Sequence, residues 1–428
     1  MNSPTPWTTL EGLRYGLLGF PLAFCALPLY VMLPNLYARE FGVPLAALGA
    51  VLLGARLFDA LIDPLLGRVC DKLFRRSRRA VLTFGAGAGL VLGLGFVLLF
   101  SPPTRDPQTL LVVATALLVV TYAAYSALTI AHQSWGARLG GNELQRSRVV
   151  AWREGLGLMG VILAAVTPSV LGLPAMLGLF VLSLVVGWLA WTRALTPAPF
   201  SGGQAGAADP THSTWRPWHN QAFRRLLAVF MLNGIASAIP ATLVLFFVQD
   251  RLQAPAVMEP AFLGCYFVCG ALSIPLWLQG VRRWGLARCW LIGMLLSISV
   301  FLWAMQLGAN DTAAFLVVCA LSGVALGSDL ALPGAMLAGV IVHAADHGRA
   351  EGAYFGWWSL ATKLNLALAA GLALPLLSLF GYAPGARDAQ ALSALTTAYC
   401  LLPCLLKAGA ALALYTLIIQ PAQRLRAP

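Results

Sequence analysis

Charged residues are scarce in this sequence. Asp, Glu, Lys and Arg make up only 10% of its 428 residues, whereas apolar residues make up 59%. A soluble globular chain carries roughly a quarter of charged residues, so this composition excludes an ordinary soluble domain and predicts a membrane protein. Acidic residues are the scarcer sign, because 28 Lys and Arg outnumber 16 Asp and Glu and give a net charge of +12. The basic residues fall mostly in short gaps between apolar runs, which is the positive-inside pattern. We therefore expect a lipid bilayer, and no nucleic acid, as partner.

Signatures of enzyme chemistry are also missing. The sequence has no G-x-x-x-x-G-K-[ST] phosphate loop, no G-x-S-x-G elbow and no H-E-x-x-H helix, which argues against an ATP-driven pump or a hydrolase. We expect no enzyme activity, no cofactor and no metal. The eight cysteines lie in or beside apolar runs without nearby His or acidic residues, which favours packing over metal binding. No cleavable signal peptide is expected, because the first apolar run is long and leads into further spans.

Long apolar runs predict about twelve membrane helices. They cover approximately residues 13–37, 45–70, 80–100, 109–135, 149–171, 174–191, 226–248, 261–278, 289–307, 313–342, 354–380 and 391–419. The longest polar stretch contains SGGQAGAADPTHSTW and is typical of a flexible linker. It separates an N-terminal six-helix half (1–192) from a C-terminal one (226–428), with 193–225 as the linker. The placement of arginines predicts that the linker and both termini are cytoplasmic. This all-α layout is that of major facilitator transporters.

The second apolar run carries three charges, Arg56, Asp59 and Asp63. A charge near the bilayer centre costs a few kcal/mol, and the i,i+3 and i,i+4 spacings place all three on one face of a helix. That face should point into the bundle or a watery cavity. Two carboxylates one turn apart cannot both ionise cheaply, so the pair is a candidate site for a proton or a small cation. The alternative is a structural Arg–Asp bridge with one spare Asp.

Other polar side chains within the runs are candidates for a role in transport. Lys363 lies deep in the eleventh run and needs a carboxylate or substrate partner, for which the second-run pair is the obvious choice; snorkelling is the weaker alternative. Arg153, near the start of the fifth run, either lines a cavity or anchors the helix at the interface. Asp329 lies near Gly327 and Pro333, where a broken helix would expose it to substrate.

A cluster of polar and aromatic residues ends the fourth run. His132 could shuttle protons, although packing or capping is the more common role for such a residue. Trp135 is either an interface-belt residue or a stacking platform for a ring, and Gln133 lies between the two. Trp358 in the eleventh run completes the set of predicted substrate contacts.

The loop after the second run resembles the major facilitator superfamily. Residues 67–72, GRVCDK, match its G-x-x-x-D-[RK] loop, with Gly67, Asp71, Lys72, Arg75 and Arg76 as the predicted gating residues. More narrowly, R-x-x-D-x-x-x-D-P at residues 56–64 resembles the melibiose-permease-type glycoside–pentoside–hexuronide:cation symporters. Tyr15-Gly16 in the first run, Arg153 and Lys363 also match. The resemblance implies that Asp59 and Asp63 hold the coupling cation, that Lys363 lies near them and that Arg153 lines the substrate cavity.

Departures from that family bear on substrate and ion. Where sugar-transporting relatives place polar groups in the first and fourth helices, this chain has Leu22, Ala23 and Ala131, so ordinary disaccharide binding is in doubt. Ile62 replaces the amide found in Na⁺-using relatives, which favours H⁺ over Na⁺ as the coupling ion. The hydroxyls of Ser126 and Thr129 remain candidate ligands for either ion.

The sequence therefore predicts a secondary transporter that works by alternating access. We expect cation-coupled symport of a small solute, of the sugar or glycoside class by resemblance, in a multi-pass protein of the bacterial cytoplasmic (inner) membrane that acts as a monomer. A lysophospholipid or amphiphile carrier is the first alternative, because Leu22, Ala23 and Ala131 form an apolar face. A drug:proton antiporter is the second, although the fifth run lacks the Gly-Pro signature of antiporters.

Overall fold

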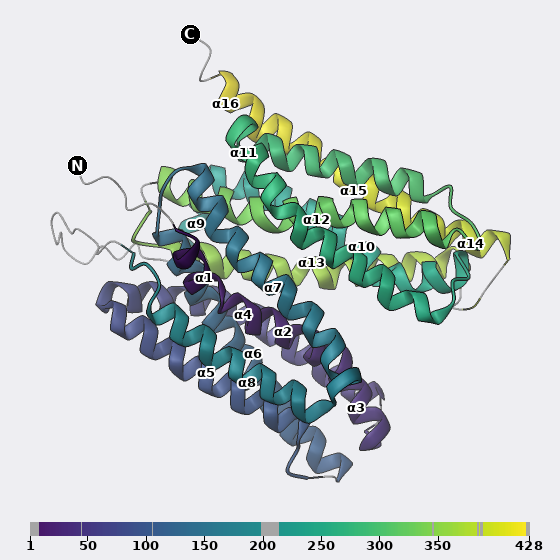
Figure 1. The fold of residues 1–428 in the computed structure, drawn as a ribbon, viewed down its shortest axis with the longest axis horizontal. Helices are drawn as coiled ribbons and strands as arrows, with labels where there is room; N and C mark the ends of the chain where they lie inside the picture. The colour runs from purple at the N-terminus through teal and green to yellow at the C-terminus, as the bar shows by residue number, and fades with distance from the viewer. Residues whose placement is uncertain are drawn as a thin grey trace. The chain divides into compact units, whose positions relative to one another are not determined.

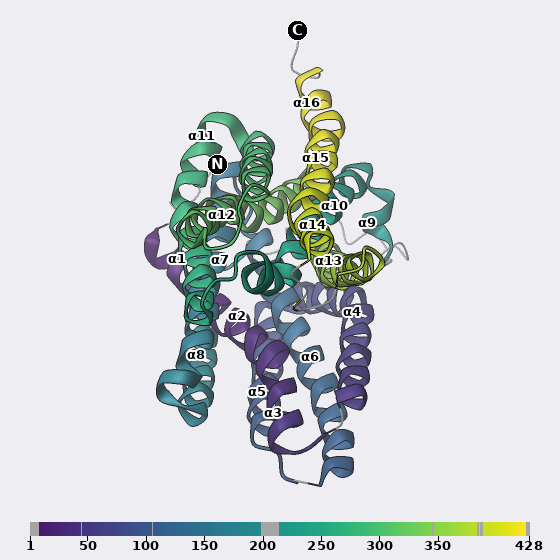
Figure 2. The same ribbon diagram turned by 90° about the vertical axis from the view of Figure 1, so that its right-hand side faces the viewer.

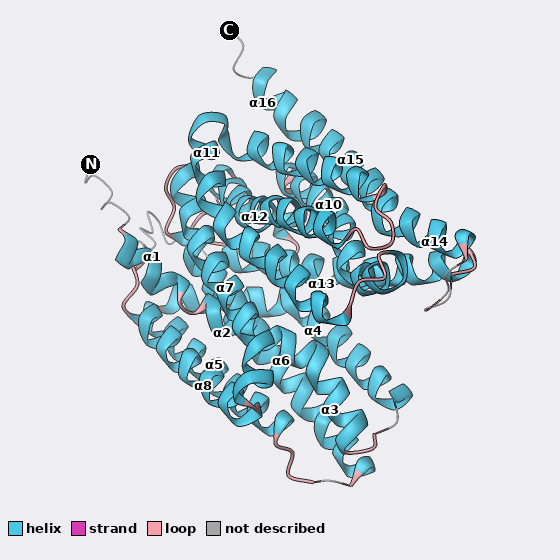
Figure 3. Ribbon diagram, turned by 45° about the vertical axis from the view of Figure 1, so that its right-hand side comes forward, coloured by secondary structure: helices cyan, strands magenta, loops and turns pink. Residues whose placement is uncertain are grey.

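The computed structural model describes residues 8–43, 45–104, 106–197, 214–344, 346–382, 385 and 388–424. Within these residues the chain forms helices and loops without any strand (Figure 3). The prediction of an all-helical protein is therefore confirmed. Most of the predicted linker, residues 198–213, lies outside the described part of the chain.

The helices group into two compact units. The first unit comprises Met1–His219 together with Ile341–Leu360, and the second comprises Asn220–Val340 with Ala361–Pro428. A short stretch from the C-terminal half thus belongs to the first unit. Each unit is described by itself below.

The first unit is built mainly from long helices. Its elements are α1 (Thr9–Gly16), α2 (Gly19–Leu27), the π-turn η1 (Pro28–Met32), α3 (Leu33–Glu40), α4 (Leu45–Arg76), α5 (Arg78–Phe100), α6 (Pro107–Arg138), α7 (Glu143–Leu171), α8 (Leu173–Thr192), α9 (Arg216–His219) and the start of α13 (Glu351–Leu379). α6 packs against both α4 and α5, and α5 also packs against α8 (Figures 1 and 2). α2 packs along α7. This arrangement places the predicted carboxylate pair of α4 against α6.

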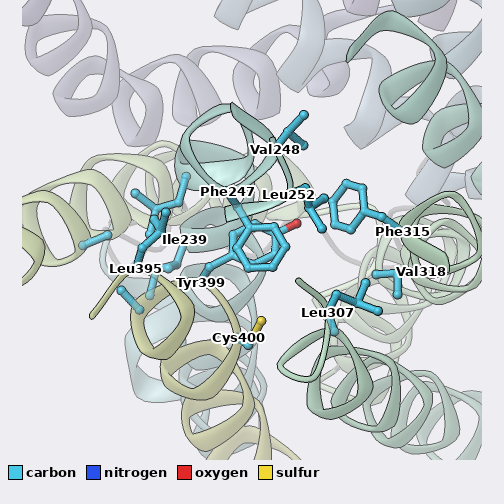
Figure 4. Packing of buried hydrophobic residues seen from close by; sticks show 14 of the residues in the cluster. Ile239, Phe247, Val248, Leu252, Leu307, Phe315, Val318, Leu395, Tyr399 and Cys400 are labelled. Atoms are coloured by element: carbon cyan, nitrogen blue, oxygen red, sulfur yellow. The ribbon is translucent and has the colours of Figure 1, made fainter. Parts of the chain in front are cut away.

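The second unit follows the same pattern. Its elements are α10 (Gln221–Phe246), the π-turn η2 (Phe247–Arg251), the 3₁₀ turn η3 (Ala256–Met258), α11 (Glu259–Ala304), most of α12 (Thr312–His343), the rest of α13, α14 (Ala389–Thr396), η4 (Thr397–Leu401), α15 (Leu402–Leu414), η5 (Tyr415–Ile419) and α16 (Gln420–Arg424). α15 packs against α10 and α11. An apolar core joins these helices, with Phe247 stacked on Tyr399 at 4.2 Å between ring centroids (Figure 4).

Polar caps fix where several helices begin. Ser77, Asp106, Asn142, Asn220 and Asp388 each accept a backbone N–H from the first turn of the next helix. These side chains satisfy N–H groups that have no partner within the helix. Four of them lie in short polar gaps between apolar runs and Asn220 lies in the predicted linker, which is why these polar segments predicted the helix boundaries well.

Nine helical stretches of the described chain are long and apolar enough to cross a membrane. α4 and α13 are long helices outside this set, and both carry charged residues within their length. α11 consists of two helices joined at Gly285, whose backbone φ of +76° breaks the helix. Only glycine adopts this conformation without strain, so the two runs predicted here correspond to the two arms of α11.

Candidate functional site

The carboxylates of α4 lie inside the first unit. Asp59 is 3% exposed and Asp63 is completely buried, and the Ser126 hydroxyl on α6 donates a 2.6 Å hydrogen bond to Asp59 Oδ1. Arg56, one turn earlier in α4, is half-buried. The structure therefore places two acidic groups and a hydroxyl donor together among buried residues of the first unit.

α6 continues this polar surface toward its C-terminal end. Ser126, Thr129 and Gln133 recur at i, i+3 and i+7, so they share one face of the helix. The Gln133 Oε1 atom is buried and has no hydrogen-bond partner among the described residues. This face of α6 therefore carries polar groups in addition to those next to Asp59 and Asp63. Ion binding by the two carboxylates does not explain why these further groups are polar.

Tyr15 and His132 pair between α1 and α6, and the Tyr15 side chain also interacts with Arg153 of α7. The Tyr15 hydroxyl donates to the His132 carbonyl at 3.1 Å, the His132 ring Nε2 contacts the Tyr15 carbonyl at 2.8 Å, and the rings stack at 4.3 Å. Trp135 is fully buried, and its indole N–H donates to the Leu195 carbonyl at 2.9 Å. These contacts fit the alternative in which His132 packs against its neighbours. The substrate roles predicted for Tyr15, His132 and Trp135 stay predictions.

Arg153 near the start of α7 is paired with its neighbour. Its guanidinium Nε lies 3.0 Å from Glu154 Oε1, and its side chain is mostly buried. A charged pair at this depth needs polar surroundings, so the position is compatible with a cavity lining. The predicted contact with substrate stays untested.

α4 and the start of α13 meet backbone to backbone along a glycine seam, which we define as Asp63, Gly67 and Asp71 of α4 with Gly352 and Gly356 of α13. A Cβ atom added at Gly67 would lie 2.1 Å from the Gly352 carbonyl oxygen, and one added at Gly356 would lie 2.5 Å from that of Asp63. Only glycine permits this approach. The seam runs directly from the buried Asp63 to Asp71, two turns later in α4.

Asp71 caps the start of α13. Its Oδ1 accepts the Gly352 N–H at 2.8 Å and its Oδ2 accepts the Ala353 N–H at 2.9 Å. The first N–H groups of a helix lack partners within the helix and favour a negative charge. Asp71 therefore ties α4 to α13 through backbone groups that are present whatever the side chains.

Arg138 at the end of α6 completes a latch, which we define as Asp71, Arg138 and Glu351. Its Nη2 atom lies 2.9 Å from Asp71 Oδ1 and 2.8 Å from Glu351 Oε2, and its Nη1 donates to the Gly348 carbonyl at 2.8 Å. All three latch side chains are buried. Arg138 and Glu351 were not among the predicted gating residues. The sequence offered a weak signal for both: Arg138 follows the fourth apolar run and Glu351 precedes the eleventh.

The remaining predicted gating residues do not join the latch. Lys72, Arg75 and Arg76 are exposed at the end of α4. Trp358, another predicted substrate contact, is buried in the part of α13 that belongs to the first unit. Gly67 and Asp71 are thus the predicted gating residues that the structure brings into contact with α13.

Asp329 in α12 is the centre of a buried network in the second unit. Its Oδ1 accepts hydrogen bonds from Asn233 Nδ2 at 3.0 Å and Trp290 Nε1 at 2.9 Å. Its Oδ2 accepts from Ser237 Oγ at 3.2 Å and Lys407 Nζ at 2.9 Å. Four donors from α10, α11 and α15 therefore hold one carboxylate. Lys407, missed in the sequence, is only 5% exposed in its side chain.

Lys363 and the contact between Tyr382 and Asp250 also belong to the second unit. Lys363 is half-buried on α13 in this unit, and its predicted proximity to Asp59 and Asp63 stays a prediction. Beyond α13, the Tyr382 hydroxyl and the Gly385 N–H both donate to Asp250. Burial and the adjacent carboxylate raise the pKa of Tyr382 well above its usual value, so this phenol remains a donor at neutral pH.

Two curated proteins show what the chain is similar to. It is 24% identical over 412 residues to the "Uncharacterized symporter YjmB" of Bacillus subtilis, covering 89% of this chain and 86% of that protein. It is 26% identical over 258 residues to the "Inner membrane symporter YicJ" of Escherichia coli, covering 56% of this chain and 53% of that protein. Both relatives are named as symporters.

Solved structures of transporters share the fold. A bacterial homologue of the iron transporter ferroportin in an outward-facing state matches with a TM-score of 0.68 at 17% identity, covering 95% of this chain and 98% of that chain. The E. coli fucose:proton symporter FucP matches with a TM-score of 0.68 at 14% identity, covering 94% and 98%. At these identities the likeness concerns the fold alone.

A family model described as "MFS/sugar transport protein" matches residues 14–420, almost the whole chain. The relatives and the structural neighbours are membrane transporters and not enzymes. The helical fold of each unit and the charged residues on α4 are consistent with this family match. The chain is a multi-pass membrane transporter that belongs to the MFS/sugar transport protein family.

Proposed function

We propose that this protein is a proton-coupled symporter of a small hydroxyl-rich solute, of the sugar or glycoside class, that works by alternating access. The observation that carries the coupling is the buried pair on α4, in which Asp63 is completely buried and Asp59 accepts from Ser126. The family match supports the solute class. The proposed topology has twelve spans, which counts α4, α13 and each arm of α11 separately in addition to the other apolar helices. We propose that both termini lie in the cytoplasm, as the arginine distribution predicts.

A proton is the coupling ion that fits this site best. A buried carboxylate pair holds one proton more tightly than a free Asp does, because two adjacent charges in a low-dielectric site repel. Na⁺ needs several oxygen ligands in a fixed cage. Between Asp59 and Asp63 in the sequence this chain has Ile62, whose side chain offers no oxygen ligand. The hydroxyls of Ser126 and Thr129 would assist whichever ion binds. In this scheme no cofactor or metal takes part, and the monomer is the working unit.

The glycine seam offers a route from ion binding to gating. Asp63 and Asp71 lie on the same face of α4, and both contact the start of α13. Protonation of the pair would change the charge at one end of the seam, while the latch holds its other end closed on the cytoplasmic side. Lys72, Arg75 and Arg76 would support the same closure from the exposed end of α4.

Substrate contacts are proposed for the polar groups that follow the pair. Gln133 has a buried oxygen that no described residue contacts by a hydrogen bond, and Arg153 lies mostly buried on the next helix, α7. An amphiphile carrier is the second candidate, because Leu22, Ala23 and Ala131 replace the polar residues of sugar-transporting relatives.

A thermal-shift screen tests the solute class directly. Purified protein in detergent is heated with sugars, uronides, lysophospholipids and lipophilic cations, each with and without Na⁺, at acidic and neutral pH. A ligand that binds the folded state raises the melting temperature by mass action. We expect stabilisation by a sugar or uronide. Stabilisation by lysophospholipid alone would establish the carrier instead, and stabilisation by Na⁺ alone would contradict proton coupling.

The coupling role is tested by Asp63→Asn. This variant keeps the size of the side chain but cannot release a proton, so we expect normal folding and loss of gradient-driven accumulation in membrane vesicles. Ser299→Ala, which removes an exposed hydroxyl of α11, is the control and should accumulate normally. Full accumulation by Asp63→Asn would remove Asp63 from the mechanism.

A further inference from the structure

Two buried amide oxygens in the second unit have no hydrogen-bond partner in the described part of the chain. Asn233 of α10 is 3% exposed and Asn365 of α13 is 5% exposed. The Oδ1 atom of each makes no hydrogen bond with any described residue. Buried side-chain oxygens are nearly always satisfied, so these two atoms indicate a donor that the described chain does not supply.

The side chain of Asn365 on α13 approaches α10 next to Asn233. A Cβ atom added at Gly234, the residue after Asn233, would lie only 1.9 Å from Asn365 Nδ2. Glycine at this position therefore makes room for the Asn365 side chain directly against α10. Asn365 thus packs against the residue that follows Asn233, so both amides lie at one contact between α10 and α13 within a single unit.

The Asp329 network fixes which end of the Asn233 amide is available. Asn233 Nδ2 donates to Asp329 Oδ1 at 3.0 Å, and an amide rotated by half a turn would place two acceptors against each other. Asp329 is itself held by Trp290, Ser237 and Lys407. The network therefore presents Asn233 Oδ1 as an acceptor and leaves it no alternative.

We propose that Asn233 and Asn365 form a hydroxyl-recognising subsite of the second unit, with Asp329 as the residue that positions Asn233. The ligand is a sugar-class solute whose O–H groups donate to the two amide oxygens, so the inference rests on the proposed function and deepens it. Neutral amide oxygens suit uncharged donors, and the hydrocarbon tail of an amphiphile offers none.

The subsite answers a difficulty raised by the sequence. A hydroxyl-rich solute needs several buried polar partners, yet Leu22, Ala23 and Ala131 stand where sugar-transporting relatives have polar groups. Leu22 and Ala131 are buried in the first unit and provide no side-chain hydrogen bond. In this chain the second unit would supply the missing acceptors.

The experiment compares parent sugars with analogues that lack one hydroxyl. D-galactose, D-glucose, D-glucuronate and their deoxy derivatives are tested for binding to the detergent-purified full chain. We expect at least one deoxy analogue to bind wild type about tenfold more weakly than its parent, the effect of one lost hydrogen bond. Asn233→Leu or Asn365→Leu should weaken the parent by a similar factor and should no longer distinguish the two.

Controls separate recognition from stability. Ser273→Ala removes a buried hydroxyl that is satisfied by the Gly270 and Val324 carbonyls, so it should retain the wild-type selectivity even if it melts earlier. The double variant Asp329→Asn/Lys407→Met removes both charges together, and an amide at position 329 accepts either end of Asn233. We expect this folded variant to lose the deoxy discrimination as well, which a purely structural network would leave unchanged.

Three outcomes would overturn the proposal. Unchanged deoxy discrimination in both Asn variants would mean that the amides hold only a structural water. A Na⁺-induced stabilisation that disappears in the Asn variants would make them cation ligands. Wild-type binding of no sugar, with binding of another solute class in the screen above, would refute the proposed function itself and the subsite with it. The first outcome leaves the proposed function intact, whereas the second contradicts its proton coupling but not its solute class.

Discussion

Lys407 and Asp329 are an energetically demanding pair of side chains. Taking an ammonium and a carboxylate out of water costs several kcal/mol for each, and their attraction compensates only when the remaining donors and acceptors are also satisfied. Here Asp329 accepts from Asn233, Ser237 and Trp290 in addition to Lys407. Each residue of this network is therefore needed by the others, and the pair behaves as one neutral unit.

Breaking the pair on one side should destabilise the second unit. Asp329→Asn leaves Lys407 buried without a counter-charge, and the expected loss of folding free energy is about 3–5 kcal/mol. The measurement is the unfolding transition in detergent. Asp329→Asn/Lys407→Met should recover most of this loss, because it removes both charges. A single variant as stable as wild type would mean that Lys407 reaches water.

Lys407 could have been predicted from the sequence as a buried charge. It lies in LLPCLLKAGAALAL, and the rule that singled out Lys363 applies to it equally. Its partner could not be found, because 78 residues separate Asp329 from Lys407 and no local pattern links them. Asp59 and Asp63 were found because helical periodicity places neighbours four residues apart on one face.

At the scale of elements, the glycine seam decides how closely α4 and α13 approach. A Cβ atom added at Gly352 would lie 2.2 Å from the Gly67 carbonyl oxygen, whereas one added at Gly371 of the same helix meets nothing within 4 Å. Gly352→Ala must therefore separate the two helices, at a cost of about 1–3 kcal/mol. Gly371→Ala is the matched control and should be neutral or slightly stabilising.

The native Cys70 reports on this separation. It is buried beside Asp71 in α4, so labelling by a membrane-impermeant maleimide, located by mass spectrometry, should be slow in wild type and in Gly371→Ala. We expect faster labelling and slower transport in Gly352→Ala. Equal labelling of Cys70 in all three proteins would show that the seam does not control closure.

Arg138 gives a second, independent test of the same closure. Its guanidinium contacts Asp71, Glu351 and the Gly348 carbonyl at once, and a lysine ammonium cannot reproduce this fork. Arg138→Met leaves two buried carboxylates without a cation and should weaken the closed contact by on the order of 3 kcal/mol. Arg138→Lys should fall between Arg138→Met and wild type in Cys70 labelling. A normal labelling rate in Arg138→Met would exclude the latch.

The helices themselves were largely predictable, and the contacts between them were not. Apolar runs and polar caps marked most boundaries, including the two arms of α11 on either side of Gly285. The seam escaped prediction because Gly352 and Gly356 acquire meaning only opposite Gly67 and Asp63. The same residues would be ordinary small residues of a membrane helix if α4 did not lie against them.

At the scale of the whole molecule, coupling requires that ion binding and closure influence each other. The first unit contains both the buried carboxylate pair and the latch, and α4 carries residues of each. The second unit contributes the neutral Asp329–Lys407 pair and the two amides proposed to bind solute. Ion binding is thus proposed for the first unit alone, whereas solute contacts are proposed in both units, so Asn365→Leu in the second unit should weaken solute binding before it affects ion coupling.

Uptake by proteoliposomes under single imposed gradients tests this scheme. One elementary charge crossing a potential of 100 mV gains about 2.3 kcal/mol, which supports about 50-fold accumulation for each proton carried with a neutral solute. Using the solute that stabilises the protein in the thermal screen, we expect accumulation under an inward proton gradient or a negative interior. We expect no accumulation under a Na⁺ gradient alone, and a protonophore should abolish the accumulation driven by protons.

Two variants are compared in the same assay. Asp63→Asn should retain exchange of labelled for unlabelled solute without net accumulation, whereas Asn365→Leu should accumulate but need about tenfold more solute. If both variants lost exchange and accumulation together, the assignment of ion coupling to Asp63 and of solute recognition to Asn365 would be wrong.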